Sequence, residues 1–432
     1  MSNTHTQCIP SKTVCNDPDL LYHLQTVLDK VYHQTTTGRR MRIPAPNPVS
    51  LTLSNLSLLR TNPYYVAEKT DGIRYLLVLT RHNNHHVSVM IDRSFTVYQT
   101  GVVADAWFFH DTVIDGELIH EPSEKCNYYY AFDLVSVCGQ SLFYEPYSKR
   151  REWLEGIIGY DPPLNIDLMD RNDACRQLAK DGRVVSVYSN HLPLQFKFKV
   201  MYDLSETKSV YNHLNDKNSD GLIFTPKNDI VKAGLDKETL KWKKKHTVDM
   251  ALTIRKSSCG HEIRLCYVNE KKRSPTNKGP VLCNALRGFH YHSNYNLMEM
   301  DMEMIVRTNR FDDFTYMFMH MDIQSTPFKN LMSKIVSISS QTNTENYEVT
   351  IIGEFEITMP STFNEAIKSQ IEDLTMVDPN IRRFKLSPIL CTMTRYRPDK
   401  PNPNNFRTIQ QTILNIIENI DIDAIPTTIS LH

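Results

Sequence analysis

Residues 64–80 read YYVAEKTDGIRYLLVLT, two apolar runs separated by a charged segment that contains Lys69. Aromatic and β-branched residues on both sides predict short strands, and RHNNHH at 81–86 predicts a polar hairpin connection to a third strand. The apolar residues come as runs rather than strict alternations, which indicates strands buried on both faces. The K-x-D-G at 69–72 is weak evidence alone, because a chain of this size contains one by chance roughly one time in ten.

Seven further patches follow this segment in order. They are IDR at 91–93, DGEL at 115–118, FD at 132–133, Lys199 in KFKVMYDL, SDGLIF at 219–224, LKWK at 240–243 and RPDKPNPN at 397–404. Each has an ordinary explanation alone: Glu117 or Asp133 as a strand-end carboxylate, Phe132 as a core residue. As an ordered set they resemble the covalent nucleotidyltransferase superfamily, which comprises mRNA capping guanylyltransferases and ATP-dependent polynucleotide ligases. The resemblance covers roughly residues 60 to 410.

Several details resemble the capping branch. KTDGIR is followed by a hairpin that ends in IDR, and SDGLIFTP has an aspartate where ligases more often carry glutamate. LKWK is followed by TVD at 247–249, although Lys244 stands where that branch usually has proline. A ligase that carries AMP on Lys69 remains the alternative, and a catalytically dead scaffold that binds RNA is a second one.

The resemblance implies that Lys69 attacks the α-phosphate of GTP and passes GMP to the 5′-diphosphate end of RNA. Arg74 and Glu117 are then expected to hold the ribose, Phe132 to stack on guanine and Lys199 to read its O6 edge. The implied nucleotide-binding residues are Arg74, Arg93, Glu117, Phe132, Lys199, Lys241, Lys243, Arg397 and Lys400. Asp220 is the implied ligand of Mg²⁺ or Mn²⁺, and Asp71, Asp249 and Asp399 are supporting residues.

A lysine nucleophile must be neutral, but its ordinary pKa of about 10.4 leaves roughly one molecule in 2,500 reactive at pH 7. Nearby cations disfavour the ammonium form. We therefore expect Lys241, Lys243 and the metal near Lys69. Arg397 and Lys400 would contact the β- and γ-phosphates only when the two domains close.

The predicted fold is α+β. An antiparallel-sheet nucleotidyltransferase domain is expected at 1–250, an OB-fold β-barrel with insertions at 251–400, and a C-terminal helix or tail at 401–432. The spacing of apolar residues after Pro18 predicts a helix near the start of the chain. A second helix is predicted at TIQQTILNIIENI, 408–420, and is expected to pack onto the first domain.

The bulk composition narrows the class of protein. The length of 432 residues predicts two domains, and no apolar run approaches membrane-spanning length. The start of the chain does not resemble a signal peptide, and nine cysteines without framework spacing fit a reducing compartment. A formal net charge of zero means that any RNA contact depends on local patches such as KWKKKH at 241–246.

We expect a separate RNA triphosphatase and a separate cap methyltransferase as partners, with the RNA polymerase tail as a further candidate, and no membrane. The expected location is the nucleus, or a viral replication site. Two weaker alternatives concern a second site. Glu354-Phe355-Glu356 resembles the E-x-E of metal-dependent RNA triphosphatases, and scattered Cys and His at 259–292 could hold zinc, although no C-x₂-C pair is present.

Overall fold

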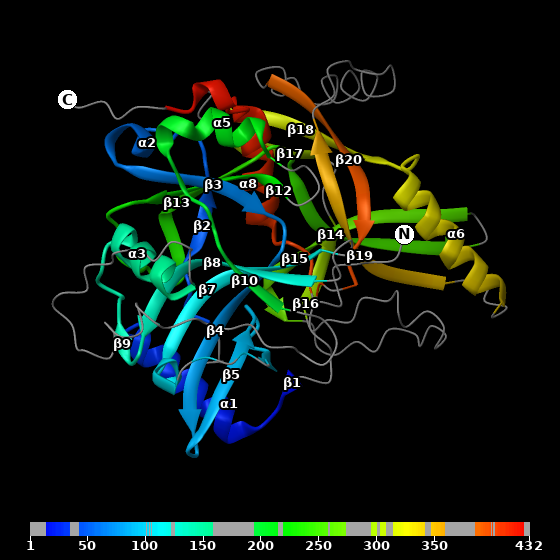
Figure 1. The fold of residues 1–432 in the computed structure, drawn as a ribbon. Helices are drawn as coiled ribbons and strands as arrows, with labels where there is room; N and C mark the ends of the chain where they lie inside the picture. The colour runs from blue at the N-terminus through cyan, green and yellow to red at the C-terminus, as the bar shows by residue number, and fades with distance from the viewer. Residues whose placement is uncertain are drawn as a thin grey trace. The chain divides into compact units, whose positions relative to one another are not determined.

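The computed structural model describes residues 14–34, 43–100, 102, 104, 106–121, 126–158, 194–214, 219–257, 260–273, 295–299, 303–307, 314–341, 347–358, 385–398, 400 and 402–426. The chain divides into two compact units. Figure 1 labels their helices and strands. Unit 1 comprises residues 1–51, 56–242 and 422–432, and unit 2 comprises residues 52–55 and 243–421. The predicted domain boundaries after residues 250 and 400 stay predictions.

The larger sheet of unit 1 contains eight strands. Its order is β1 (Val14–Cys15), β6 (Val97–Gln99), β5 (His85–Ile91), β4 (Ile73–His82), β7 (Thr112–Glu121), β8 (Cys126–Val137) and β10 (Leu194–Phe198), and β9 (Gln140–Ser141) pairs with β8. Neighbours are antiparallel, except that β10 runs parallel to β8.

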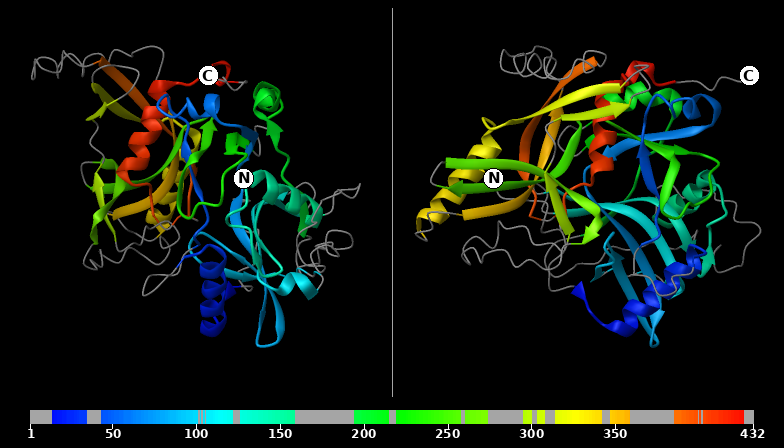
Figure 2. Two further views of the ribbon diagram at one scale, coloured as in Figure 1. Left: turned by 90° about the vertical axis from the view of Figure 1, so that its left-hand side faces the viewer. Right: turned by 180° about the vertical axis from the view of Figure 1, so that it is seen from behind.

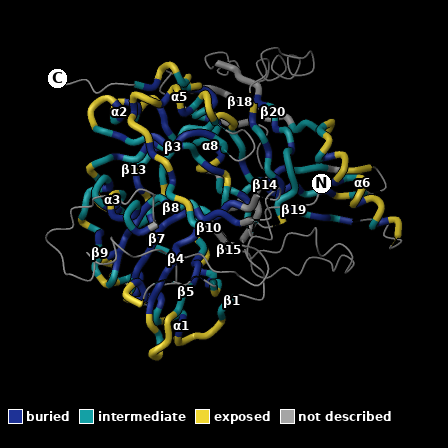
Figure 3. The backbone as a smooth tube through the Cα atoms, in the orientation of Figure 1, coloured by how far each residue is buried: buried dark blue, intermediate teal, exposed yellow. Residues whose placement is uncertain are grey.

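Helices cover both faces of this sheet. Leu76 and Val78 of β4 pack in one core cluster with helix α1 (Pro18–Val31), whereas Leu77 and Leu79 pack in another with helix α3 (Tyr147–Ile158). Figure 3 shows the central strands β4 and β7 as buried. Burial of successive residues on opposite faces confirms the interpretation of IRYLLVL as a strand buried on both sides.

The smaller sheet of unit 1 has five strands. Its order is β11 (Tyr202–Asp203), β3 (Tyr64–Thr70), β12 (Ser219–Pro226), β13 (Leu235–Lys243) and β2 (Asn47–Ser50). The turn at Asp71-Gly72 carries the chain from β3 in this sheet to β4 in the larger one. The short helical segments of unit 1 are α2 (Leu58–Thr61), η3 (Ala106–Phe109), η4 (Leu204–Glu206), α5 (Thr207–Asn212) and η7 (Ile422–Ala424).

Unit 2 is built on a curled seven-stranded sheet (Figure 2). Its order is β16 (Tyr295–Glu299), β15 (Gly260–Arg273), β14 (Thr247–Ser257), β19 (Tyr347–Thr358), β20 (Lys385–Tyr396), β18 (Phe314–Asp322) and β17 (Glu303–Arg307). Two helices, α6 (Thr326–Gln341) and α8 (Phe406–Glu418), contribute to its core. The predicted α+β fold, with largely antiparallel sheets and an OB-like second sheet, is confirmed.

Helix α8 corrects one prediction. It spans Phe406–Glu418, two residues earlier than the predicted 408–420. The Asn405 side chain accepts a hydrogen bond from the Thr408 amide as an N-cap. However, Ile409 and Ile413 lie in the core of unit 2 with Val248 of β14. The expectation that this helix packs onto the first domain is therefore wrong. Its apolar stripe predicted a buried face but could not predict which sheet covers it.

Candidate active site

Lys69 lies near the end of β3, opposite Gly221 of β12. Pairing is irregular between Ser219 and Gly221, so Asp220 sits at a bulge, and bulges re-aim side chains. The Lys69 Nζ is 2.7 Å from Asp220 Oδ1, and the two side chains are 21% and 24% exposed. The Ser219 hydroxyl donates to the Lys69 carbonyl at 3.1 Å. The bulge thus holds a carboxylate against a solvent-accessible amine.

Thr70, Glu117 and Lys199 form a connected group beside Lys69. The Lys199 Nζ donates to Thr70 Oγ1 at 2.8 Å, and the Thr70 hydroxyl donates to Glu117 Oε2. The backbone amide of Gly72 donates to Glu117 Oε1 at 3.2 Å. Burial lowers the pKa of Lys199, and the Glu117 carboxylate opposes that shift. The group places a buried cation and a carboxylate next to the amine of Lys69.

Gly72 explains the glycine of the K-x-D-G segment. A Cβ at this position would lie 2.6 Å from the Leu118 carbonyl oxygen and 2.8 Å from Glu117 Cγ. No side chain fits there without moving β7, which carries Glu117. The glycine is therefore required for close approach of the turn to β7.

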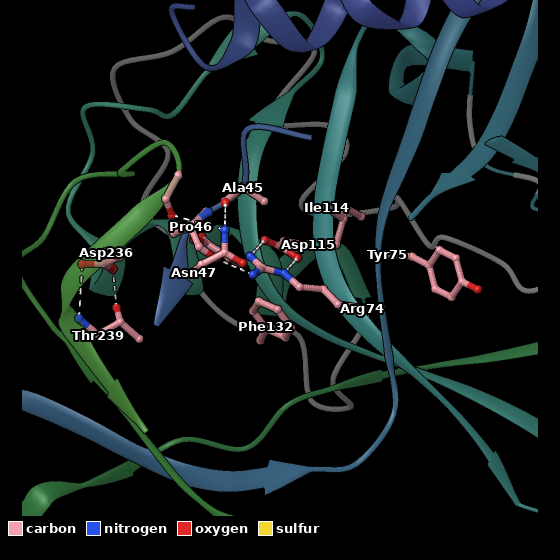
Figure 4. Close-up of polar contacts among 12 residues, drawn as sticks. Ala45, Pro46, Asn47, Arg74, Tyr75, Ile114, Asp115, Phe132, Asp236 and Thr239 are labelled. Atoms are coloured by element: carbon pink, nitrogen blue, oxygen red, sulfur yellow. Dashed lines mark hydrogen bonds and ion pairs between the residues drawn. The ribbon is translucent and has the colours of Figure 1, made fainter. Parts of the chain in front are cut away.

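Arg74 lies at the start of β4 and is clamped by protein acceptors (Figure 4). Its Nε donates to Asp115 Oδ1 at 2.8 Å, one Nη donates to Asp115 Oδ2, and the other donates to the Pro46 carbonyl. Its Cζ lies 5.5 Å from the centre of the Phe132 ring, and Figure 4 shows that ring beside the guanidinium. Three of the five guanidinium N–H groups are thus committed, which leaves at most two for a ribose.

Asp115 is almost fully buried, at 1% exposure. Burial raises the pKa of its carboxyl, and the Arg74 guanidinium counteracts that shift.

Phe132 is held through its backbone, because the Tyr147 hydroxyl donates to the Phe132 carbonyl at 2.7 Å. Pairing of β7 with β8 is irregular at this point, between Asp115 and Gly116. Phe132 thus lies at an irregularity of the sheet, with its carbonyl held by Tyr147.

A second buried ion pair lies next to the first. Asp133 is opposite Asp115 in the β7–β8 pairing, and Arg150 of α3 donates to both of its carboxylate oxygens at 2.8 and 2.9 Å. Arg150 is 3% exposed. Sequence reasoning missed Arg150, because only the fold brings α3 to the end of β8.

Arg93 is exposed and follows Asp92, whose Oδ1 accepts from the backbone amides of Ser94 and Thr96 at 2.8 Å. That Asx turn presents Arg93 to solvent. Sequence reasoning assigned Arg93 but not Asp92, although D-x-S is an Asx-turn signal.

The remaining candidates lie on β13 and in unit 2. Lys241 is opposite Ser50 in the β13–β2 pairing, and Lys243 is two residues further along the same strand. In unit 2, Arg397 donates to Asp249 Oδ1 at 3.2 Å and to Glu354 Oε1 at 3.1 Å.

Lys400 is 3.7 Å from Asp249 Oδ2, and Arg395 is 2.6 Å from Glu354. Asp71 is exposed, and Asp399 lies outside the described residues.

The structure therefore brings the predicted residues together in two groups. In unit 1, Lys69, Glu117, Lys199 and Asp220 are linked through Thr70 and through the pairing of β3 with β12. In unit 2, Asp249 links Arg397 with Lys400. The Lys69 ammonium forms an ion pair with the Asp220 carboxylate. The placement of Lys241, Lys243 and a metal ion near this amine stays a prediction.

The comparisons with known proteins match this region. A family model described as mRNA capping enzyme, catalytic domain, matches residues 4–245. The chain belongs to this family. Relatives called mRNA-capping enzyme subunit alpha include one from Yarrowia lipolytica, 27% identical over 251 residues, which are 55% of this chain and 60% of that protein. Another, from Candida glabrata, is 24% identical over 415 residues, which are 89% of this chain and 80% of that protein.

The chain spans 60% and 59% of the length of the first two of these capping-enzyme relatives. Among solved structures it is similar to a mycobacterial DNA ligase D complexed with ATP and MES, at 12% identity and a TM-score of 0.37, over 82% of this chain and 95% of that one.

The two alternative second sites gain no support from the described residues. Within the part of the chain that the structure describes, no group of three or more His, Cys, Asp or Glu is placed to hold a metal ion. Glu354 of the E-x-E segment is paired with two arginines, and Cys283, His290 and His292 lie outside the described residues.

Within the described residues no helix is long and apolar enough to span a membrane.

Proposed function

We propose that this member of the capping-enzyme family is an mRNA guanylyltransferase that works through a covalent Lys69–GMP intermediate. The observation that carries the proposal is the placement of the Lys69 amine. It lies at the end of β3, 2.7 Å from Asp220 and next to the Thr70–Glu117–Lys199 group, inside the matched region 4–245.

The first step joins Lys69 Nζ to the α-phosphorus of GTP. The neutral amine forms a P–N bond and its nitrogen releases one proton to solvent. The bond from the α-phosphorus to the bridging oxygen breaks, and pyrophosphate leaves with that electron pair. In the second step a β-phosphate oxygen of the 5′-diphosphate RNA attacks the same phosphorus. The nitrogen takes up one proton as the P–N bond breaks, the amine of Lys69 is regenerated, and GMP is transferred to the RNA.

Each of the surrounding residues would contact a different part of the nucleotide. Phe132 supplies a ring for the guanine to stack on, and Lys199 donates to its O6 atom. Glu117 and the uncommitted N–H groups of Arg74 hold the ribose, and Arg93 meets the phosphates or the RNA end. Lys241 and Lys243 share one face of β13, because they are two residues apart on a strand, and both would contact the α-phosphate.

The residues around Lys69 could bind a divalent cation through one protein carboxylate, with the other ligands coming from the substrate and water. Asp220 is a partly exposed carboxylate, and the described residues hold no larger ligand cluster. Mg²⁺ commonly uses one or two carboxylates together with substrate phosphates and water, so Asp220 would hold Mg²⁺ or Mn²⁺. When bound, the cation would supply charge neutralisation on the phosphates. Asp71 and Asp399 are proposed as supporting residues of the site.

Arg397 and Lys400 would contact the β- and γ-phosphates. In unit 2 both are already within reach of Asp249, so phosphates would have to compete with a carboxylate for the same cations. Asp249 would then keep the two side chains oriented before phosphate arrives. Closure of the domains would accompany this exchange of partners.

The proposed function implies partners. A guanylyltransferase needs an RNA with a 5′-diphosphate, so an RNA triphosphatase must act before it, and a cap methyltransferase would act after it. The name "subunit alpha" of several relatives supports separate capping subunits. We propose both enzymes as separate proteins, with the RNA polymerase tail as a further partner, and action in the nucleus or at a viral replication site.

A label-transfer experiment tests the choice of nucleotide. The chain is incubated with Mg²⁺ or Mn²⁺ and either α-labelled GTP or α-labelled ATP. We expect label on the protein from GTP, and its transfer to 5′-diphosphate RNA but not to 5′-monophosphate RNA. Label from ATP alone would overturn the proposal in favour of the ligase alternative.

A further inference from the structure

The Thr70 hydroxyl lies between a group that can only donate hydrogen bonds and one that can only accept them. An ammonium has no acceptor and an ionised carboxylate has no donor, whereas a hydroxyl does both. Lys199 Nζ donates to Thr70 Oγ1 at 2.8 Å, and that hydroxyl donates to Glu117 Oε2. The direct distance from Lys199 Nζ to Glu117 Oε2 is 3.9 Å, beyond hydrogen-bond range. Thr70 therefore bridges the two groups.

The bridge is fixed in position. Thr70 is 7% exposed, and its backbone pairs with Ser219 at the end of β3. Its branched Cβ restricts χ1, so the hydroxyl has few alternative positions. On the other side, Glu117 is held by the Gly72 amide at 3.2 Å. A side chain this constrained orients the Lys199 ammonium instead of following it.

The protonation state of Lys199 decides which base the site accepts. An ammonium donates to a carbonyl oxygen such as O6 of a 6-oxopurine but has no acceptor for the amino group of a 6-aminopurine. A neutral amine could accept from that amino group. Lys199 is 8% exposed, and its burial favours the neutral form, so acceptors around Nζ are needed to keep it charged.

We infer that Thr70 is a specificity-determining residue, which holds Lys199 as an oriented donor and thereby makes the site select 6-oxopurine over 6-aminopurine nucleotides. The inference rests on the proposed function, since it concerns the base that accompanies the Lys69 reaction. Thr70 acts through Lys199 and Glu117 and is a positioning residue.

The test uses three variants of the full chain. Thr70→Val removes the hydroxyl at nearly constant shape, and Thr70→Ser keeps the hydroxyl but loses the methyl group. Thr112→Val is the matched control, because Thr112 is also a buried threonine of unit 1, and its Oγ1 accepts from the Cys138 amide away from Lys69. If Thr70→Val does not fold, Thr70→Ala takes its place.

For each variant, kcat/KM of nucleotidyl-protein formation is measured with GTP, ATP and inosine triphosphate, which is a 6-oxopurine without the 2-amino group. A hydrogen bond to a charged group is worth a factor on the order of 10 to 100. The GTP-to-ATP ratio should fall by that factor in Thr70→Val, and the inosine-to-ATP ratio should fall in parallel. Thr70→Ser should stay near wild type, and Thr112→Val should not change the ratio.

An unchanged GTP-to-ATP ratio in folded Thr70→Val overturns the inference. So does a Thr70→Ser ratio as low as that of Thr70→Val, since packing of the methyl group would then be responsible. A wild-type chain that forms no adduct from GTP overturns the proposed function instead. In that case equilibrium binding of GTP and ATP still decides the role of Thr70: equal preference in wild type and Thr70→Val would refute it.

Discussion

The buried pair of Arg74 and Asp115 allows a quantitative prediction. Asp115→Asn removes the carboxylate charge and leaves the Arg74 guanidinium, 11% exposed, without its ionic partner. Breaking one side of a buried ion pair typically costs about 3–5 kcal/mol, because the remaining charge is desolvated and uncompensated. Asp115 is 1% exposed and accepts two guanidinium hydrogen bonds. We therefore expect Asp115→Asn to lower the free energy of unfolding by about 3–5 kcal/mol.

The assay is urea denaturation monitored on unit 1, with a matched exposed pair as control. Lys149 and Glu152 are 3.0 Å apart but 42% and 56% exposed, so Glu152→Gln should change stability by less than about 0.5 kcal/mol. The double variant Arg74→Met with Asp115→Leu replaces both charges with apolar groups and should recover most of the loss. A single variant within about 1 kcal/mol of wild type would refute the reasoning, as would a double variant no more stable than Asp115→Asn.

Two further predictions concern stability. Burial, with a smaller contribution from Lys243, lowers the pKa of His246 to about 4, so between pH 6.5 and 4 the unfolded chain binds a proton that the folded chain does not. The free energy of unfolding should therefore fall by up to about 3 kcal/mol as the pH falls through this window. Urea titrations across the same pH range should show a shallower fall for His246→Gln than for wild type. The same dependence of stability on pH in both proteins would contradict this. Gly116→Ala places a Cβ 2.4 Å from Cζ of the buried Tyr129 ring, whose hydroxyl is held by two carbonyls. It should cost about 1–3 kcal/mol in the same assay, and an unchanged denaturation midpoint would show that the ring can move.

Elements with strong local patterns could be predicted from the sequence. Residues 73–82 form a strand because their apolar run is long enough to be buried on both faces, and RHNNHH connects it to β5 as a hairpin. Helix α1 follows from Pro18 and a regular apolar stripe. These features depend on neighbours within a few residues, which a sequence displays directly.

The pairings within the site could not be predicted, because they join residues far apart in sequence. Asp220 meets Lys69 only because β12 pairs with β3 and is bulged at that point. Thr70 appeared in the sequence only as the variable position of K-x-D-G, with nothing to indicate its contacts with Glu117 and Lys199. The ordered motifs supplied the candidate residues, and the fold was needed to see which of them are in contact.

The central claim, a covalent bond between Lys69 and GMP, can be tested by mass spectrometry. The chain is incubated with GTP and a divalent cation, denatured and digested, and the adduct is mapped by fragmentation. We predict one GMP on the peptide that contains Lys69, and none in Lys69→Ala or Lys69→Arg. An adduct on a different residue, or one that persists in Lys69→Ala, would contradict the account.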